Sequence, residues 1–189
     1  YTGAYKVRGA YYKISTMSSD EREKGLITAS AGNHAQGVAY AAKLYGVPAT
    51  IVMPTTTPLI KVNRTKGYGA NVVLHGSVYD EACQKALELA EKSGATFVHP
   101  FNDETVATGQ GTIAMEIFKE LPTVDIILVP IGGGGLAAGV STLAKLLNPN
   151  IKVIGVEPAG ASCMKASLDA GKVVTLPNVE TIADGTAVK

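Results

Sequence analysis

The chain has 189 residues, enough to bury a hydrophobic core in one domain or in two small ones. Seventeen Lys and Arg residues nearly balance sixteen Asp and Glu residues, and this net charge of +1 gives no reason to expect a nucleic-acid or anionic-membrane partner. The two cysteines, Cys83 and Cys163, stand far apart and in no metal-ligand spacing, which excludes a disulfide framework and favours a reducing compartment. No signal peptide opens the chain and no apolar run is long enough to span a bilayer, so the expected location is the cytoplasm.

Short β-branched runs alternate with longer helical stretches, and each run is bounded by Gly, Pro or Asn. The strands are expected, in chain order, at 26–29, 49–53, 70–74, 96–98, 126–131 and 152–156. The helices are expected between and after them, at 34–45, 59–68, 79–93, 106–120, 136–147 and 161–170. This alternation predicts an α/β fold with mostly parallel sheets flanked by helices.

Two features predict how these elements are organised. The run at 126–131 has no polar alternation, as expected for a strand that is covered on both faces. Pro, Asn and Asp punctuate the chain at about 100–103, which is a plausible domain boundary. We therefore expect a small α/β domain at 25–102, with 1–24 and 103–189 forming part of a larger domain.

Four consecutive glycines follow the expected strand at 126–131 and precede the helix at 136–147: Gly132, Gly133, Gly134 and Gly135. Without Cβ atoms the backbone can turn sharply and direct several N–H groups toward one point, beside the positive end of the helix. This arrangement favours a phosphate cradle, although the Lys-Ser/Thr ending of a nucleotide P-loop is missing. The alternative is a tight connection in which the glycines serve only packing.

A second segment of small residues, 28–37, also follows a strand and begins a helix. Ser30 and Asn33 offer side-chain hydrogen bonds beside the free N–H groups of that helix, which suits a carboxylate. The alternative is that Ser30 or Asn33 merely caps the helix, and His34 by itself is more typical of a structural residue.

A third segment places Lys6 among small and aromatic residues, in Thr-Gly-Ala-Tyr-Lys-Val-Arg-Gly. Partial burial there would lower the pKa of its amine and make it a nucleophile, whereas most lysines are simply solvated. A candidate amine, a carboxylate site and a phosphate cradle are together what a pyridoxal-phosphate enzyme acting on an amino acid requires.

These three motifs, in this order, resemble the fold-type II pyridoxal-phosphate (PLP) enzymes, and specifically the threonine dehydratase (threonine ammonia-lyase) family. The similarity extends along essentially the whole chain, through 109–113 and 182–185. It implies a tryptophan synthase β-like fold, with a small domain inserted in a larger one, and pyridoxal 5'-phosphate as the cofactor. It also implies an amino-acid substrate, a homo-oligomer, and no nucleic-acid or membrane partner.

The resemblance assigns a role to each matching residue. Lys6 would hold the cofactor covalently and then act as the base at Cα of the substrate, and the four glycines would hold the cofactor phosphate. Asn33 would hydrogen-bond the ring hydroxyl of the cofactor, and Asn102 matches a family position near it. The substrate would be bound by Ser30, Ala31, Gly32, Asn33, His34 and Asn102.

Two positions differ from the serine racemases related to this family. Ala31 replaces the serine that acts there as an acid and base on the opposite face of the substrate, so elimination is expected rather than racemisation. Glu157 and the carbonyl of Ala161 match a cation site, but Cys163 occupies the position of the second acidic ligand, which argues against a bound divalent ion.

The implied reaction is the PLP-dependent deamination of L-threonine to 2-oxobutanoate and ammonia, with L-serine giving pyruvate by the same steps. Alternatives are another PLP enzyme of β-elimination or β-replacement, such as a serine dehydratase or a cysteine synthase relative, and a non-catalytic module that binds a nucleotide or phosphate. Allosteric control and a role in isoleucine biosynthesis or in catabolism are left open. The family residue that contacts the pyridine nitrogen would lie beyond Lys189, so the resemblance implies a larger enzyme.

Overall fold

The computed structural model describes residues 1–189, which form two compact units, Tyr1–Gly109 and Gln110–Lys189. We describe each unit by itself. None of the helices combines the length and the apolar character that crossing a membrane would require.

The first unit is built on a four-stranded sheet in the order β3-β2-β1-β4, in which every neighbouring pair is parallel. All four residues of β1 are buried, as expected for a central strand with both faces covered. The strands are β1 (Leu26–Ala29), β2 (Ala49–Met53), β3 (Asn71–Leu74) and β4 (Thr96–Phe97).

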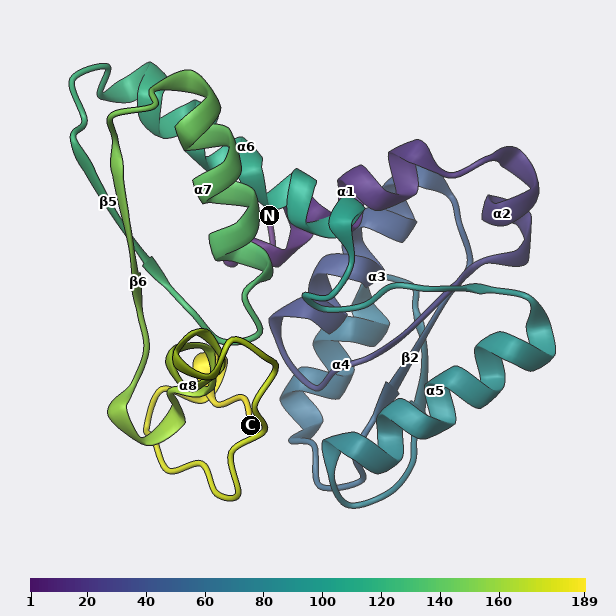
Figure 1. The fold of residues 1–189 in the computed structure, drawn as a ribbon. Helices are drawn as coiled ribbons and strands as arrows, with labels where there is room; N and C mark the ends of the chain where they lie inside the picture. The colour runs from purple at the N-terminus through teal and green to yellow at the C-terminus, as the bar shows by residue number, and fades with distance from the viewer. The chain divides into compact units, whose positions relative to one another are not determined.

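Helices cover both faces of this sheet (Figure 1). On one face, α1, α3 and α4 bury residues such as Ile14, Val38 and Val62 in one core with the strands. On the other face, Ala82 and Ala86 of α5 pack against Ile27, Ala29 and Val52. The helices of this unit are α1 (Lys6–Thr16), α2 (Ser19–Lys24), α3 (Asn33–Tyr45), α4 (Leu59–Gly67) and α5 (Tyr79–Ser93).

The strand order contains one reversal of direction. From β1 the chain proceeds outward through β2 to β3, and it then returns through α5 to place β4 on the other side of β1. The strand order therefore reverses between the adjacent strands β1 and β4, and α3, which follows β1, and α5, which precedes β4, pack in different cores of the sheet. In open α/β sheets, such a switch point is where ligands bind.

The second unit contains a two-stranded parallel sheet of β5 (Ile126–Pro130) and β6 (Lys152–Val156). Buried residues of α6, α7 and the strands, such as Ala114, Val140 and Ile127, form its core. The helix α6 (Glu104–Glu120) begins in the first unit and continues in the second. The remaining elements are α7 (Gly135–Leu147), η1 (Ala159–Ala161), α8 (Cys163–Ala170) and η2 (Asp184–Thr186).

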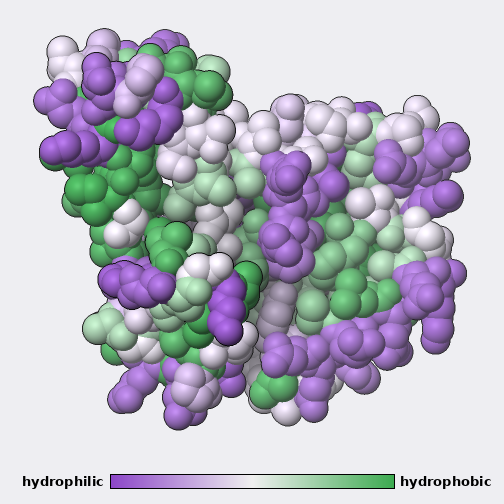
Figure 2. All heavy atoms as spheres, viewed as in Figure 1, coloured by the Kyte–Doolittle hydropathy of each residue, from purple (hydrophilic) through white to green (hydrophobic).

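The prediction that the strand at 126–131 is covered on both faces is wrong. Ile127 and Val129 are buried, but the alternate residue Leu128 is 65% exposed and its cross-strand neighbour Ile154 is 44% exposed. The physical reason is that the helices of this unit pack on one face of the sheet only. Figure 2 shows apolar side chains gathered over these strands.

The predicted strands and helices are otherwise confirmed, with shifts of one or two residues at several ends. The helices α1 and α2 were not predicted. The α2 start carries a complete capping box, in which Ser18 and Glu21 each accept a hydrogen bond from the other's backbone N–H. The division into domains at 25–102 stays a prediction, whereas residues 1–24 belong in this structure to the same compact unit as the four-stranded sheet.

Candidate active site

The connection between β1 and α3 leaves the first turn of the helix open to a ligand. The N-cap of α3 is Gly32, and no side chain caps it. The Ser30 hydroxyl instead accepts a hydrogen bond from the Gly32 N–H (3.2 Å), and Asn33 is the exposed first residue of the helix. The alternative in which Ser30 or Asn33 serves as the helix cap is therefore wrong, and the N–H groups of the first turn face the carboxyl edge of the sheet.

The segment after β4 lies on the other side of the switch point and is tied to the same edge. The Val98 carbonyl accepts hydrogen bonds from the Thr28 hydroxyl (2.7 Å) and from Nε2 of His34 (3.0 Å). Asp103 accepts from the Val106 N–H at the start of α6 and forms an ion pair of 2.9 Å with Lys13 of α1. These contacts join β1, α3, α1 and the 98–103 segment into one site.

Lys6, the first residue of α1, extends into this site. Its Nζ donates a hydrogen bond to the Pro100 carbonyl (2.5 Å) and lies 5.4 Å from the centre of the Tyr5 ring. Burial lowers the pKa of the Lys6 amine to about 8 from its ordinary value of 10.5. About a tenth of this amine is therefore neutral, and hence nucleophilic, at pH 7, far more than for an ordinary lysine.

Two glycines let neighbouring helices approach α1 closely beside Lys6. A Cβ atom on Gly37 of α3 would lie 2.9 Å from the backbone nitrogen of Val7 and 3.0 Å from the Lys6 carbonyl carbon. A Cβ atom on Gly109 of α6 would lie 2.7 Å from the Arg8 carbonyl oxygen. The absence of side chains at these two positions fixes where the start of α1 can lie.

His34 is the buried histidine of the site. Burial lowers the pKa of its imidazole to about 4, so the ring is neutral and donates from Nε2 to Val98. Its Nδ1 is buried without a hydrogen-bond partner. Buried acceptors without a partner are uncommon in folded proteins.

In the second unit, the glycine loop occupies the turn from β5 into α7. Gly134 has a φ of +87°, a left-handed conformation that favours glycine, and α7 begins at the next residue. The N–H groups of Gly132, Gly133 and Gly134 donate no hydrogen bond within the chain. Free N–H groups at a helix N-terminus form an anion site, so the loop can hold a phosphate.

Glu157, the candidate cation ligand, has a structural role. Its two carboxylate oxygens accept hydrogen bonds from the backbone N–H groups of Met164 (2.9 Å) and Lys165 (2.8 Å) in the first turn of α8. A cation at Glu157 and the buried Ala161 would compete with both of these bonds. No group of three or more His, Cys, Asp or Glu side chains is placed to hold a metal ion.

Several residues that shape the site were not predicted as functional, among them His99, Pro100, Asp103 and Gly37. The His-Pro-Phe-Asn-Asp segment 99–103 does follow a strand, and this was the available signal. Asn102 was predicted from this segment, and its side chain is exposed. Its backbone N–H donates to His99.

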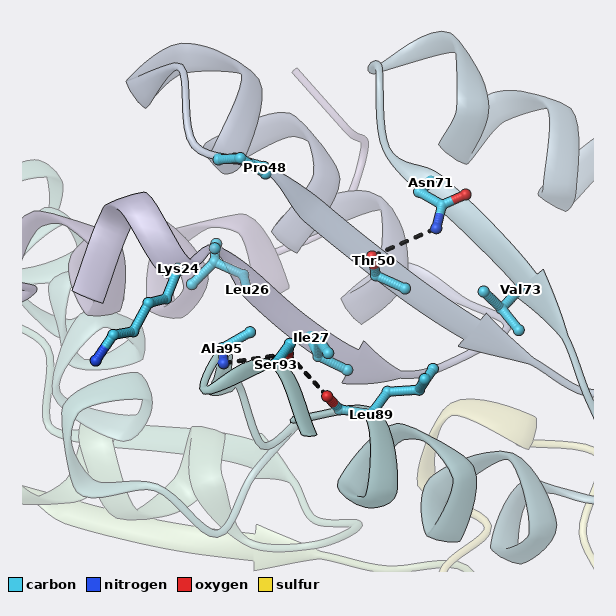
Figure 3. Close-up of a pocket in the computed structure, with 11 residues that line it drawn as sticks. Lys24, Leu26, Ile27, Pro48, Thr50, Asn71, Val73, Leu89, Ser93 and Ala95 are labelled. Atoms are coloured by element: carbon cyan, nitrogen blue, oxygen red, sulfur yellow. Dashed lines mark hydrogen bonds between the residues drawn. The ribbon is translucent and has the colours of Figure 1, made fainter. Parts of the chain in front are cut away.

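A separate groove of about 250 Å³ lies at the opposite, amino-terminal edge of the four-stranded sheet (Figure 3). It is lined by Leu26 and Asn71, the first residues of β1 and β3, and by Leu89 and Ser93 of α5. The Ser93 hydroxyl donates within the helix to the Leu89 carbonyl, and Asn71 donates to Thr50. The groove thus presents no convergent set of free polar groups.

Known proteins resemble this chain in both sequence and fold. The L-threonine ammonia-lyase of Thermotoga maritima is 53% identical over 188 residues, which cover 100% of this chain and 47% of the relative. The structure of processed threonine deaminase isoform 2 from Solanum lycopersicum matches with a TM-score of 0.95 at 52% identity. The match covers 98% of this chain and 54% of the deaminase chain. Maize serine racemase also matches with a TM-score of 0.95, at 41% identity, over 99% of this chain and 57% of the racemase.

The chain thus spans about half the length of these relatives. A family model described as pyridoxal-phosphate dependent enzyme matches all of residues 1–189. This match and identities above 50% over nearly the whole chain establish the family. The chain belongs to the pyridoxal-phosphate dependent enzymes.

Proposed function

We propose that the protein containing this chain deaminates L-threonine to 2-oxobutanoate and ammonia, with pyridoxal phosphate bound to Lys6. The observation that carries the proposal is the half-buried Lys6 amine with its lowered pKa, held at the switch point of the sheet beside the open first turn of α3. A nucleophilic amine next to a carboxylate site is the arrangement that an amino-acid substrate requires.

The residues of the chain fit the cofactor at two places, one in each unit. The Lys6 amine suits a covalent bond to an aldehyde, and the free N–H groups of Gly132, Gly133 and Gly134 suit a phosphate. When bound, the cofactor supplies an electron sink that makes the Cα proton of an amino acid acidic. Asn33 is proposed to hydrogen-bond the ring hydroxyl, with Asn102 nearby.

The remaining steps are assigned to side chains of the first unit. Ser30, Asn33 and the N–H groups of the α3 first turn bind the substrate carboxylate, which orients the Cα proton. The Lys6 amine would remove this proton as a general base. Ala31 carries no group that could deliver a proton to the other face, so the proposed outcome is loss of the β-hydroxyl rather than racemisation.

Threonine and serine differ at this site by one methyl group. A single methyl group in a pocket contributes only about 1–3 kcal/mol to discrimination. We therefore propose that serine is also a substrate and gives pyruvate at a lower rate. The names of the relatives from Thermotoga maritima and Solanum lycopersicum support threonine as the preferred substrate.

The proposal is tested with the whole protein and two variants, Lys6→Ala and the exposed control Lys24→Ala. The protein is incubated with pyridoxal phosphate, reduced with borohydride and mapped by peptide mass, and 2-oxo acid formation from threonine is measured in parallel. Lys6→Ala should lose the reduced adduct and at least about 100-fold of the activity, because the base is removed. The control should keep both. An adduct that remains in Lys6→Ala on another lysine, with activity intact, would overturn the proposal.

The products separate the proposed reaction from its rivals. A β-replacement enzyme would form cysteine from an activated serine and sulfide, and a racemase incubated with L-serine would leave D-serine in the recovered substrate. The proposed deaminase should give 2-oxobutanoate and ammonia in equal amounts and no D-isomer. A colourless protein that binds a nucleotide would instead favour a non-catalytic module.

We also propose self-association of the protein, on the basis of the family resemblance. Sedimentation velocity of the whole protein measures this directly, and a monomer across the micromolar range would contradict it.

A further inference from the structure

The 99–102 segment is a turn that a histidine side chain closes on its own backbone. Nδ1 of His99 accepts hydrogen bonds from the N–H groups of Phe101 (3.2 Å) and Asn102 (2.8 Å). Asn and Asp side chains close turns in the same way, by accepting from the backbone two residues later. His99 therefore substitutes for an Asx residue in this turn.

The turn contains the acceptor of the Lys6 amine. Pro100, which lies between His99 and its two donors, is buried, and its carbonyl accepts the hydrogen bond from Lys6 Nζ. The proline ring fixes the φ of Pro100. The hydrogen bonds that His99 accepts from Phe101 and Asn102 therefore determine where the Pro100 carbonyl points. The amine and the carbonyl are 94 positions apart in the sequence, and Nζ also lies over the ring of Tyr5, the N-cap of α1, 5.4 Å from its centre.

We propose that His99 is a positioning residue for Lys6: its ring nitrogen, by accepting two backbone hydrogen bonds, fixes the turn that presents the Pro100 carbonyl to the Lys6 amine. The inference rests on the proposed function only for the chemical role of Lys6. The positioning itself is a property of the first unit and can be measured without the cofactor.

Only the neutral imidazole can act in this way, because a protonated Nδ1 has no lone pair to offer. Burial lowers the pKa of His99, and the charge of Lys6 lowers it further, against the opposing effect of Asp103. The charged or titratable groups that face the ring are thus Lys6, Asp103 and His34. The neutral form is the one that its surroundings favour.

A simpler role for His99 would be aromatic packing. Its ring makes edge contacts with Phe97 (centroids 6.1 Å apart) and Phe101 (4.6 Å apart). Two substitutions separate this role from the acceptor role. His99→Asn keeps an acceptor suited to the turn and loses the ring, whereas His99→Phe keeps the ring and loses the acceptor.

The experiment measures the pKa of the Lys6 amine in the whole protein freed of cofactor. Lysines are labelled with trace acetic anhydride over a range of pH, and the label at Lys6 is quantified by peptide mass against that at the exposed Lys24. Hydrogen exchange of the Phe101 and Asn102 amides is followed on the same proteins. His99→Asn should resemble the wild type, with a Lys6 midpoint at about 8. In His99→Phe the turn opens, so exchange at both amides should accelerate at least about tenfold, and the midpoint should rise by about half a unit or more as water reaches the amine.

A His99→Phe protein with the wild-type midpoint, or a His99→Asn protein shifted as far as His99→Phe, would overturn the inference. His99→Ala removes the acceptor with less bulk and replaces His99→Phe should the latter not fold. Borohydride trapping of pyridoxal phosphate on the same proteins distinguishes the two proposals. If Lys6 takes up no cofactor in any of these proteins, the proposed function fails. The positioning role still stands if the titration midpoint of Lys6 changes when residue 99 loses its hydrogen-bond acceptor.

Discussion

At the residue scale, the chemistry of Lys6 comes from its surroundings rather than from the residue type. The sequence motif identified this lysine as a candidate amine, since small and aromatic neighbours allow partial burial. The partner of the amine could not be predicted, because Pro100 is remote in the sequence and accepts through its backbone carbonyl, which any residue would provide. The open first turn of α3 was likewise undecided, because Ser30 and Asn33 are equally typical of helix caps.

The lowered pKa of Lys6 predicts how covalent capture of the cofactor depends on pH. Burial favours the uncharged amine, so the neutral, reactive fraction should reach one half at about pH 8 instead of at the ordinary value of 10.5. The initial rate of borohydride-stable adduct formation should rise as the pH increases toward 8 and level off above it. Stopped-flow absorbance with pyridoxal phosphate, followed by peptide mapping of Lys6, measures this. A rate that keeps rising steeply up to pH 10 would mean that the amine is not desolvated.

At the element scale, periodicity and punctuation were sufficient for strands and helices that are bounded by glycine or proline. The bounds of β1, β2, β6 and α5 agree with the prediction. The helix α1 was missed because its sequence combines a glycine, β-branched residues and two tyrosines, which are weak helix formers, and its stability comes from packing against α3. The helix α2 could have been predicted, since Ser18 and Glu21 have the spacing of a capping box.

The close approach of α3 to α1 makes Gly37 a sensitive position. Gly37→Ala should destabilise the fold by about 1–3 kcal/mol, because the new Cβ meets backbone atoms of Lys6 and Val7 that cannot move independently. Urea unfolding monitored by circular dichroism gives the change in free energy. The shifted start of α1 should also slow the capture of pyridoxal phosphate by Lys6.

Gly67→Ala is the matched control for this substitution. Gly67 is also helical, at the end of α4, and its Cβ would meet no atom within 4 Å. This change should be neutral or stabilise the protein by up to about 1 kcal/mol, as alanine favours helices. Equal effects of the two substitutions would show that the contact beside Lys6 is not tight.

At the scale of the whole molecule, the alternation of strands and helices predicted an α/β fold with parallel sheets, and this is confirmed. The strand order was beyond prediction, because the position of β4 beside β1 depends on non-local pairing that leaves no local pattern. The roles of the site residues stay predictions. The prediction that β5 is buried on both faces was wrong, because a continuous apolar run indicates an apolar strand but not how many layers pack on it.

The bare face of the second sheet has a consequence for the behaviour of this chain in solution. Leu128 and Ile154 lie side by side on that face, and both strands are edges with unpaired backbone groups. Such an edge is a template for pairing with another chain, and an apolar surface strengthens the pairing. The isolated polypeptide should accordingly self-associate and form oligomers of no fixed size as its concentration rises.

Leu128→Thr tests this, because threonine is β-branched, a shape that strands favour, and makes the face less apolar. Light scattering coupled to gel filtration should show at least about a twofold smaller aggregated fraction for this variant. Leu168→Thr, a change at an exposed leucine of α8, should leave the aggregated fraction unchanged. If both substitutions reduce the aggregated fraction equally, the self-association comes from general surface hydrophobicity and not from the open strands.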